Sequence, residues 1–315
     1  MKVFAYRGES RSYPENTMLA FKKAIQSGAD GIQLDVHFSR ERYLVVFHDD
    51  SLSRVMDAVG FVRHHSISDL KNYNYKMQYE GPRQHIITLE EYLNWAKELP
   101  LQTVIHLKND QFFYPGMEDQ ICQMISRFGL EDRVLLSSQR LDSLGLIRSY
   151  HPEMKIAWLA HSSSDSLLER VQALKPDWVI PHITLMHPGF VQKMREIGVK
   201  LMPYVIKSDV EAQRMESMGA EAILTDEVQP IRQSLGLKKN PYSESELERA
   251  KTAEDLIGDQ DGEQPLTAKA KLKLAKRSSN LGSGLLGILL SMAISVGAAV
   301  LAGMLVFNLL KGFLK

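Results

Sequence analysis

Eight polar or aromatic residues stand at or just beyond the ends of apolar runs, where their side chains could act together. Arginine and lysine bind anions, carboxylates bind metal ions, and imidazoles transfer protons near neutral pH. Such a set suits an anionic ligand. The residues are Tyr6, Arg7, Glu15, Gln33, Asp35, His48, His106 and Lys108.

Short β-branched runs alternate with amphipathic stretches over residues 1–236, and this alternation predicts the fold. The runs that read as strands are KVFAY, DGIQLDVHF, YLVVFH, TVIHLK, RVLLSS, KIAWLA, DWVIP, KLMPYV and AILTD. About eight strand–helix units predict a (β/α)₈ TIM barrel, whose active sites lie at the C-terminal ends of the strands. An open doubly wound sheet is the alternative, but no glycine-rich dinucleotide motif follows the first strand.

The second and third strand-like runs are too close together for a crossover helix. Only SRER separates them, so we expect an antiparallel hairpin with its turn centred on Arg40–Glu41. That turn would place His48 opposite Gln33, with Asp35 next on the same face. Residues 49–87 contain no clear barrel unit and predict a small insertion above the barrel.

The overall composition excludes some classes of partner. Lysine plus arginine and aspartate plus glutamate number 38 each in 315 residues, so no global positive field would gather nucleic acid. Cys122 is the single cysteine, which rules out an internal disulfide. The first residues turn polar too soon for a signal peptide.

The last quarter of the chain predicts a membrane anchor. Residues 237–280 are polar and charged, which indicates a linker, whereas residues 281–310 carry no charge. That length exceeds the ~20 apolar residues needed to cross a bilayer, so we expect one transmembrane helix; a buried core helix is the alternative. More lysine and arginine precede this segment than follow it, which predicts a cytoplasmic barrel on a single-pass membrane protein.

Several motifs resemble those of the glycerophosphodiester phosphodiesterase family, a group of PLC-like phosphodiesterase TIM barrels. AYRGESRSYPENT, GADGIQLDV and FHDD stand where the family has His-Arg-Gly, Pro-Glu-Asn-Thr, Gly-Ala-Asp-Gly-Ile-Glu-Leu-Asp-Val and His-Asp. TVIHLK falls at the family's Ile-Glu-Ile-Lys strand, and GAEAILTD resembles its closing motif. The resemblance covers about residues 1–236.

The resemblance implies cleavage of glycerophosphodiesters to an alcohol and glycerol 3-phosphate, in lipid metabolism. Two histidines and a carboxylate-bound divalent metal would do this chemistry. By position, Arg7 matches the phosphate clamp, His48 the second catalytic histidine and Lys108 the active-site lysine, which would also bind phosphate. Glu15 and Tyr204 match further pocket positions, with Tyr204 replacing a tryptophan.

Three of the catalytic and metal-binding positions also depart from the family pattern. Tyr6 replaces the first catalytic histidine, while Gln33 and His106 replace two of the three metal carboxylates and leave Asp35. We therefore expect a catalytically impaired domain, a pseudoenzyme with no bound cofactor, that acts as a phosphate-ligand-binding or interaction module. Its ligand would be a glycerophosphodiester or glycerol phosphate; the sequence identifies no protein partner.

Two alternatives stay open. An active phosphoric diester hydrolase would use Mg²⁺ or Ca²⁺ or, as a less favoured choice, Zn²⁺ held by Asp35, His48 and His106. A purely structural barrel would only position the linker and the anchor.

Overall fold

The computed structural model describes residues 1–77, 79 and 81–251, and within them the predicted barrel is confirmed. Eight parallel strands follow one another in the order β8-β7-β6-β5-β4-β2-β1-β9. Their bounds are β1 (Lys2–Tyr6), β2 (Gly31–Phe38), β4 (Gln102–Leu107), β5 (Val134–Ser138), β6 (Lys155–Ala160), β7 (Trp178–Pro181), β8 (Lys200–Leu201) and β9 (Ala222–Thr225). Backbone hydrogen bonds from Glu221 to Leu201 and from Leu224 to Pro203 bring β8 and β9 together, so the sheet nearly closes.

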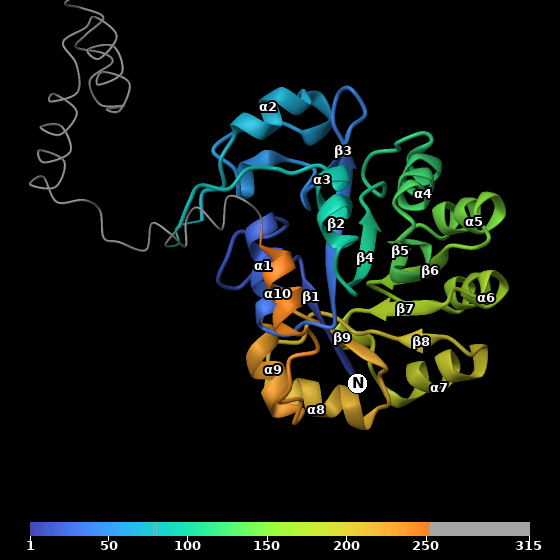
Figure 1. Cartoon of the computed structure of the whole chain (residues 1–315). Coiled ribbons are helices and arrows are strands. Elements are labelled where there is room, and N and C mark those ends of the chain that lie inside the picture. Colours follow the sequence, from blue (N-terminus) through green and yellow to red (C-terminus); the bar gives the residue numbers. More distant parts are fainter. Residues whose placement is uncertain (78, 80, 252–315) are drawn as a thin grey trace, which may run out of the picture. The chain divides into compact units, whose positions relative to one another are not determined.

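Helices surround the strands, as the periodicity of the sequence predicts (Figure 1). They are α1 (Met18–Gln26), α3 (Leu89–Ala96), α4 (Met117–Phe128), α5 (Leu141–Tyr150), α6 (Asp165–Leu174), α7 (Pro188–Ile197), α8 (Asp209–Ser217) and α9 (Val228–Ser234). Short 3-10 turns lie at Glu131–Arg133 and Ile183–Leu185. Most of the α-helices around the barrel begin at a residue whose side chain caps the helix. Thr88, for example, forms a reciprocal capping box with Glu91 at the start of α3. The apolar faces of helices and strands form one large core cluster, so the described barrel is held mainly by hydrophobic burial.

The predicted hairpin is present, but its register differs by one residue from the expectation. Strand β3 (Leu44–Val46) pairs antiparallel with β2, and Phe38 lies opposite Leu44. The turn therefore centres on Glu41, and Arg42 takes a left-handed φ of 68° to close it. Gln33 is not opposite His48 in the ladder, yet His48 follows the end of β3 and still enters the same pocket.

The insertion between β3 and α3 forms a small layer of its own. It contains two 3-10 turns, Leu52–Arg54 and Val62–His64, and helix α2 (Ile67–Asn72). A separate apolar cluster holds it onto β3, where Val45 and Phe47 pack with Leu52 and Met56. This layer lies within residues 49–87, where the sequence analysis expected a small insertion.

The compact unit extends to Lys251, beyond the boundary expected at residue 236. Helix α10 (Glu244–Ala250) packs beside α1, and Trp95 donates its indole N–H to the carbonyl of Ala250 at 2.9 Å. Tyr242 is buried, so part of the expected linker belongs to the barrel unit. The polar composition concealed this because only a few apolar side chains of the segment face the barrel.

The proposed transmembrane segment, 281–310, lies outside the described residues. Among the residues described, none of the helices is long and apolar enough to cross a bilayer.

Candidate active site

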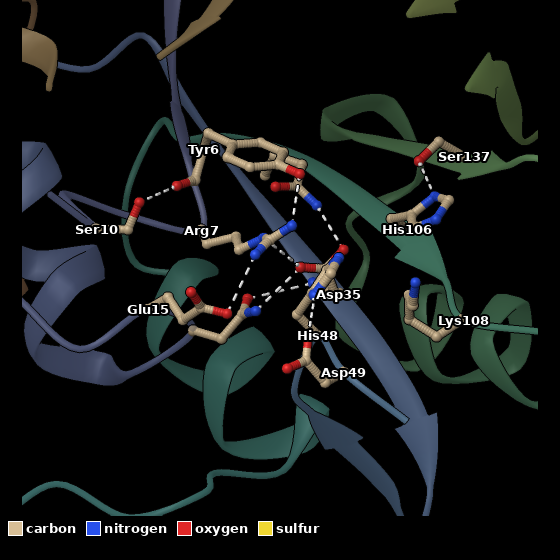
Figure 2. Close-up of polar contacts among 12 residues, drawn as sticks. Tyr6, Arg7, Ser10, Glu15, Asp35, His48, Asp49, His106, Lys108 and Ser137 are labelled. Carbon is tan, nitrogen blue, oxygen red and sulfur yellow. Dashed lines mark hydrogen bonds and ion pairs between the residues drawn. The ribbon is translucent and has the colours of Figure 1, made fainter. Parts of the chain in front are cut away.

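A pocket of about 220 Å³ lies at the C-terminal ends of the barrel strands and collects most of the predicted site residues. Its lining includes Tyr6, Arg7, Gln33, Asp35, His48, His106, Lys108 and Tyr204. Glu15 contacts Arg7 beside this lining. Figure 2 shows Tyr6 and Arg7 above Asp35, with His48 below and His106 and Lys108 to one side.

Arg7 is the centre of the polar network. It follows β1 with a φ of 61°, and Gly8 continues in the left-handed region at 83°, where a Cβ atom would meet Ala20 at 2.7 Å. The tight turn aims the guanidinium back over the strand ends. Its Nη1 donates to Glu15 Oε1 at 3.1 Å, its Nη2 donates to Tyr6 Oη at 2.6 Å, and its Nε lies 3.2 Å from Asp35 Oδ2.

Asp35 has both carboxylate oxygens engaged by neighbouring N–H donors. Asn16 Nδ2 donates to Oδ2 at 3.0 Å, and Gln33 Nε2 donates to Oδ1 at 3.1 Å. Burial would raise the pKa of this carboxyl, but neighbouring positive charge, chiefly that of Arg7, outweighs burial and holds the pKa well below its usual range. Asp35 is therefore an ionised partner of Arg7.

His48 belongs to a chain of charges that connects the insertion to the barrel. Its Nδ1 lies 2.6 Å from Asp49 Oδ1, and Arg54, which lies in the insertion, contacts the same Asp49 carboxylate. Arg54 also donates to both oxygens of Glu15, at 3.1 and 2.6 Å. These contacts fix the His48 ring at the pocket edge; His37 Nε2 lies 3.1 Å from the His48 carbonyl oxygen beneath it.

His106 and Lys108 come from β4 and its end, next to Asp35 on β2. The ladder pairs Asp35 with His106, so both lie at the same height in the barrel. Burial lowers the pKa of His106 to about 3, which keeps the ring neutral at pH 7. Lys108 is 8% exposed, and its Nζ is 3.8 Å from Asp110 Oδ1.

Aromatic rings form one wall of the pocket. Tyr6 and Tyr204 stack with ring centroids 6.0 Å apart. His161, at the end of β6, contacts Tyr204 Oη through Nδ1 at 2.8 Å and lines the pocket. Burial raises the pKa of Tyr6 to about 12, so its phenol stays protonated at neutral pH.

The predicted metal-ligating residues come together without forming a site for a hard cation. Asp35 is their one carboxylate; its oxygens already accept hydrogen bonds from Asn16 and Gln33, and it is ion-paired with Arg7. Within residues 1–77, 79 and 81–251, no group of three or more histidine, cysteine, aspartate or glutamate side chains is arranged to hold a metal ion. The residues present therefore do not fit the Mg²⁺ or Ca²⁺ that the resemblance implied.

Sequence reasoning missed several residues that build this pocket. Asn16 was visible in the PEN motif, and Asp49 directly follows His48, so adjacency offered a signal for both. No local signal pointed to the other three residues. Arg54 reaches the site only through the path of the insertion, and Ser137 and His161 reach it from the ends of β5 and β6.

Comparisons with known proteins agree with this architecture. Residues 7–229 match the model of the Glycerophosphoryl diester phosphodiesterase family. A glycerophosphodiester phosphodiesterase of Bacillus altitudinis is 32% identical over 241 residues, covering 71% of this chain and 94% of that protein. The uncharacterized protein YqiK of Bacillus subtilis is 35% identical over 235 residues, with coverages of 71% and 94%.

Solved structures show the same fold. A putative glycerophosphoryl diester phosphodiesterase of Silicibacter pomeroyi superposes with a TM-score of 0.67 at 18% identity, covering 75% of this chain and 93% of that chain. A phosphodiesterase of Oleispira antarctica, in complex with the product sn-glycerol-3-phosphate, has a TM-score of 0.64 at 23% identity, with coverages of 75% and 97%. The family match over most of the barrel places this chain in the glycerophosphoryl diester phosphodiesterase family.

Proposed function

We propose that this chain is a catalytically impaired member of its family that binds a phosphate-bearing glycerol ligand at the barrel mouth. The observation that carries the proposal is the state of Asp35, whose two oxygens accept from Asn16 and Gln33 and pair with Arg7. The carboxylate that a metal ion would need is thus already bound by the guanidinium of Arg7 and the side-chain amides of Asn16 and Gln33.

Electrostatics argues against metal-assisted hydrolysis. At about 4 Å and an effective dielectric near 20, each carboxylate contributes roughly 4 kcal/mol of gross attraction to a bound charge. Gln33 and His106 supply no negative charge, and His106 is neutral at pH 7. Two such losses leave little to offset the dehydration of Mg²⁺ or Ca²⁺.

The acid–base pair is also incomplete. His48 keeps its Asp49 partner, but Tyr6, with its pKa raised to about 12, is a poor base at neutral pH. Loss of one acid–base group typically costs about 10²–10⁴-fold in rate. His161 does line the pocket, yet its ring is engaged with Tyr204 on the aromatic wall.

Anion binding is the capacity that the pocket retains. Lys108 lines the pocket, and the guanidinium of Arg7 lies at its edge between two carboxylates. The Oleispira antarctica phosphodiesterase, which shares the fold, holds sn-glycerol-3-phosphate. By analogy of fold, we propose the same class of ligand here.

The test is a thermal-shift titration of the full-length protein with glycerol 3-phosphate. Binding predicts a saturable rise in melting temperature that is lost in Lys108→Met, a variant that keeps the length of the side chain without its charge. Lys200→Met, on the partly exposed far end of β8, is the matched control and should keep the rise. The absence of a shift in the unmodified protein would contradict the proposal and favour a purely structural barrel.

We further propose that residues 281–310 hold the barrel at the cytoplasmic face of a membrane. The support is the length of this uncharged segment and the excess of lysine and arginine before it. Protease added to intact cells should leave the barrel uncut, whereas protease added to inverted membrane vesicles should digest it. Digestion in intact cells would contradict this orientation.

An active phosphodiesterase is the second candidate. It is favoured by relatives named glycerophosphodiester phosphodiesterase and by the retained His48–Asp49 pair. This candidate predicts metal-dependent turnover that His48→Ala abolishes.

A further inference from the structure

Two buried polar atoms of the pocket lining have neither a hydrogen-bond nor an ion-pair partner among the described residues; a third, Arg7 Nε, makes no hydrogen bond but lies 3.2 Å from Asp35 Oδ2. Gln33 Oε1 and His106 Nε2 accept or donate no hydrogen bond to any residue that the structure describes. Gln33 is 4% exposed and His106 is 3% exposed, and both side chains line the pocket. An unpaired buried polar atom costs about 1–3 kcal/mol, so a ligand that supplies the missing partner is strongly favoured.

The neighbours of these two side chains decide which groups they offer to a ligand. Gln33 gives its amide N–H to Asp35 Oδ1, which leaves the carbonyl oxygen as the free end. On the other side, Ser137 Oγ lies 3.1 Å from His106 Nδ1 and directs its hydroxyl to the carbonyl of Ile105 at 3.5 Å. Ser137 then accepts from Nδ1–H, and His106 Nε2 carries a free lone pair. Both free atoms are acceptors.

Two buried acceptors require a donor, either a cation or an O–H group. The pocket already contains the cations Arg7 and Lys108, and Arg7 is paired with the one carboxylate of the set, Asp35. A divalent ion would add two positive charges beside them with no further anion to compensate. A neutral hydroxyl supplies the donor without that repulsion.

We infer that Gln33 and His106 form a hydroxyl-recognition subsite, so that the pocket takes a phosphorylated polyol without any metal ion. The inference rests on the proposed function, because the phosphate has to bind near Lys108. The ligand's hydroxyl hydrogens point to Gln33 Oε1 and His106 Nε2, at the positions where the family resemblance led us to expect metal carboxylates. The two substitutions thereby exchange a metal-ligand role for a polyol-binding role.

The test is isothermal titration calorimetry of the full-length protein in buffer containing EDTA. The two probes are glycerol 3-phosphate and propyl phosphate, which has the same three-carbon chain and phosphate but no hydroxyl groups. We expect glycerol 3-phosphate to bind at least about tenfold more tightly, because propyl phosphate leaves both acceptors unpaired. In Gln33→Met this preference should fall to within about threefold, while Gln123→Met, at an exposed glutamine of helix α4 outside the pocket, should keep it.

The outcomes separate this inference from the proposed function. Equal affinity for the two probes would overturn the hydroxyl subsite and leave phosphate binding standing. Binding of glycerol 3-phosphate that disappears in EDTA and returns with Mg²⁺ would overturn metal-free recognition. Binding of neither probe would overturn both proposals. The comparison of probes on the unmodified protein decides the question even where a variant fails to fold.

Discussion

Restoring the two missing carboxylates should create a metal site in this pocket. Gln33 Nε2 lies 3.1 Å from Asp35 Oδ1, and His106 is paired with Asp35 in the ladder, so Gln33→Glu and His106→Glu would each place a carboxylate beside Asp35. Each adds roughly 4 kcal/mol of gross attraction to a cation about 4 Å away. If desolvation and mutual repulsion cancel two thirds of the sum, about 2.7 kcal/mol remains, which is roughly a hundredfold in affinity.

Calorimetric titration with MgCl₂ measures this change directly. The double variant Gln33→Glu/His106→Glu should bind Mg²⁺ about a hundredfold more tightly than the unmodified protein, and its melting temperature should rise on adding Mg²⁺. Gln139→Glu is the matched control, since it adds a carboxylate to the pocket beyond β5, two strands from β2, and should gain far less. Equal Mg²⁺ affinity in the double variant and the unmodified protein would refute the electrostatic reasoning.

Three further predictions concern charged side chains. Asp35→Asn should lower the free energy of unfolding by about 3 kcal/mol at neutral pH, measured with urea, because Arg7 loses its buried partner. Because the pKa of Asp35 is depressed in the folded protein, this stabilisation is present above the ordinary carboxyl pKa of ~3.9 and is lost as pH falls. The difference in unfolding free energy between the unmodified protein and Asp35→Asn should therefore shrink in acid. A difference that stays constant with pH would contradict an ionised Asp35 paired with Arg7. Burial raises the pKa of Glu9 to about 7, so ionisation of Glu9 costs stability as pH rises. Glu9→Gln should therefore raise the melting temperature at about pH 8 and leave it nearly unchanged near pH 4. The reverse pattern would exclude a buried acid at this position. Arg54→Ala should cost less than about 1 kcal/mol in the same urea assay, because Arg54 is half exposed, and a larger loss would show that the insertion depends on this contact.

The strands and most residues that line the pocket could be predicted from sequence because their signals are local. An apolar run ending in a polar residue marks both a strand and its functional end, as KVFAY followed by Arg7 does. The i, i+2 spacing of Gln33 and Asp35 put both on one face of β2, and their contact in the structure follows.

The remaining features depend on contacts that no local pattern encodes. The hairpin register shifted by one residue because Arg42 adopts a left-handed conformation. The segment that contains helix α10 joins the barrel through Tyr242, just before the helix, and Ala250 at its end, two buried residues in a polar segment. Arg54 reaches Glu15 across 39 positions in the chain, through an insertion whose path the sequence did not reveal.

The hydroxyl subsite could not be predicted from sequence, because it depends on how the side chains of Gln33 and His106 are oriented. The sequence showed that Gln33 and His106 replace carboxylates, which suggested a loss. Only the contacts with Asp35 and Ser137 indicate which atom of each side chain remains free in the pocket.

Phosphodiester cleavage by the full-length protein shows most directly whether the barrel has lost its catalytic activity. Glycerophosphocholine is incubated with Mg²⁺, Ca²⁺ or Zn²⁺, and release of glycerol 3-phosphate is compared with that of a Tyr6→His/Gln33→Glu/His106→Glu variant. The unmodified protein should show no metal-dependent release, and the triple variant should gain it. Metal-dependent release by the unmodified protein that His48→Ala abolishes would contradict the account.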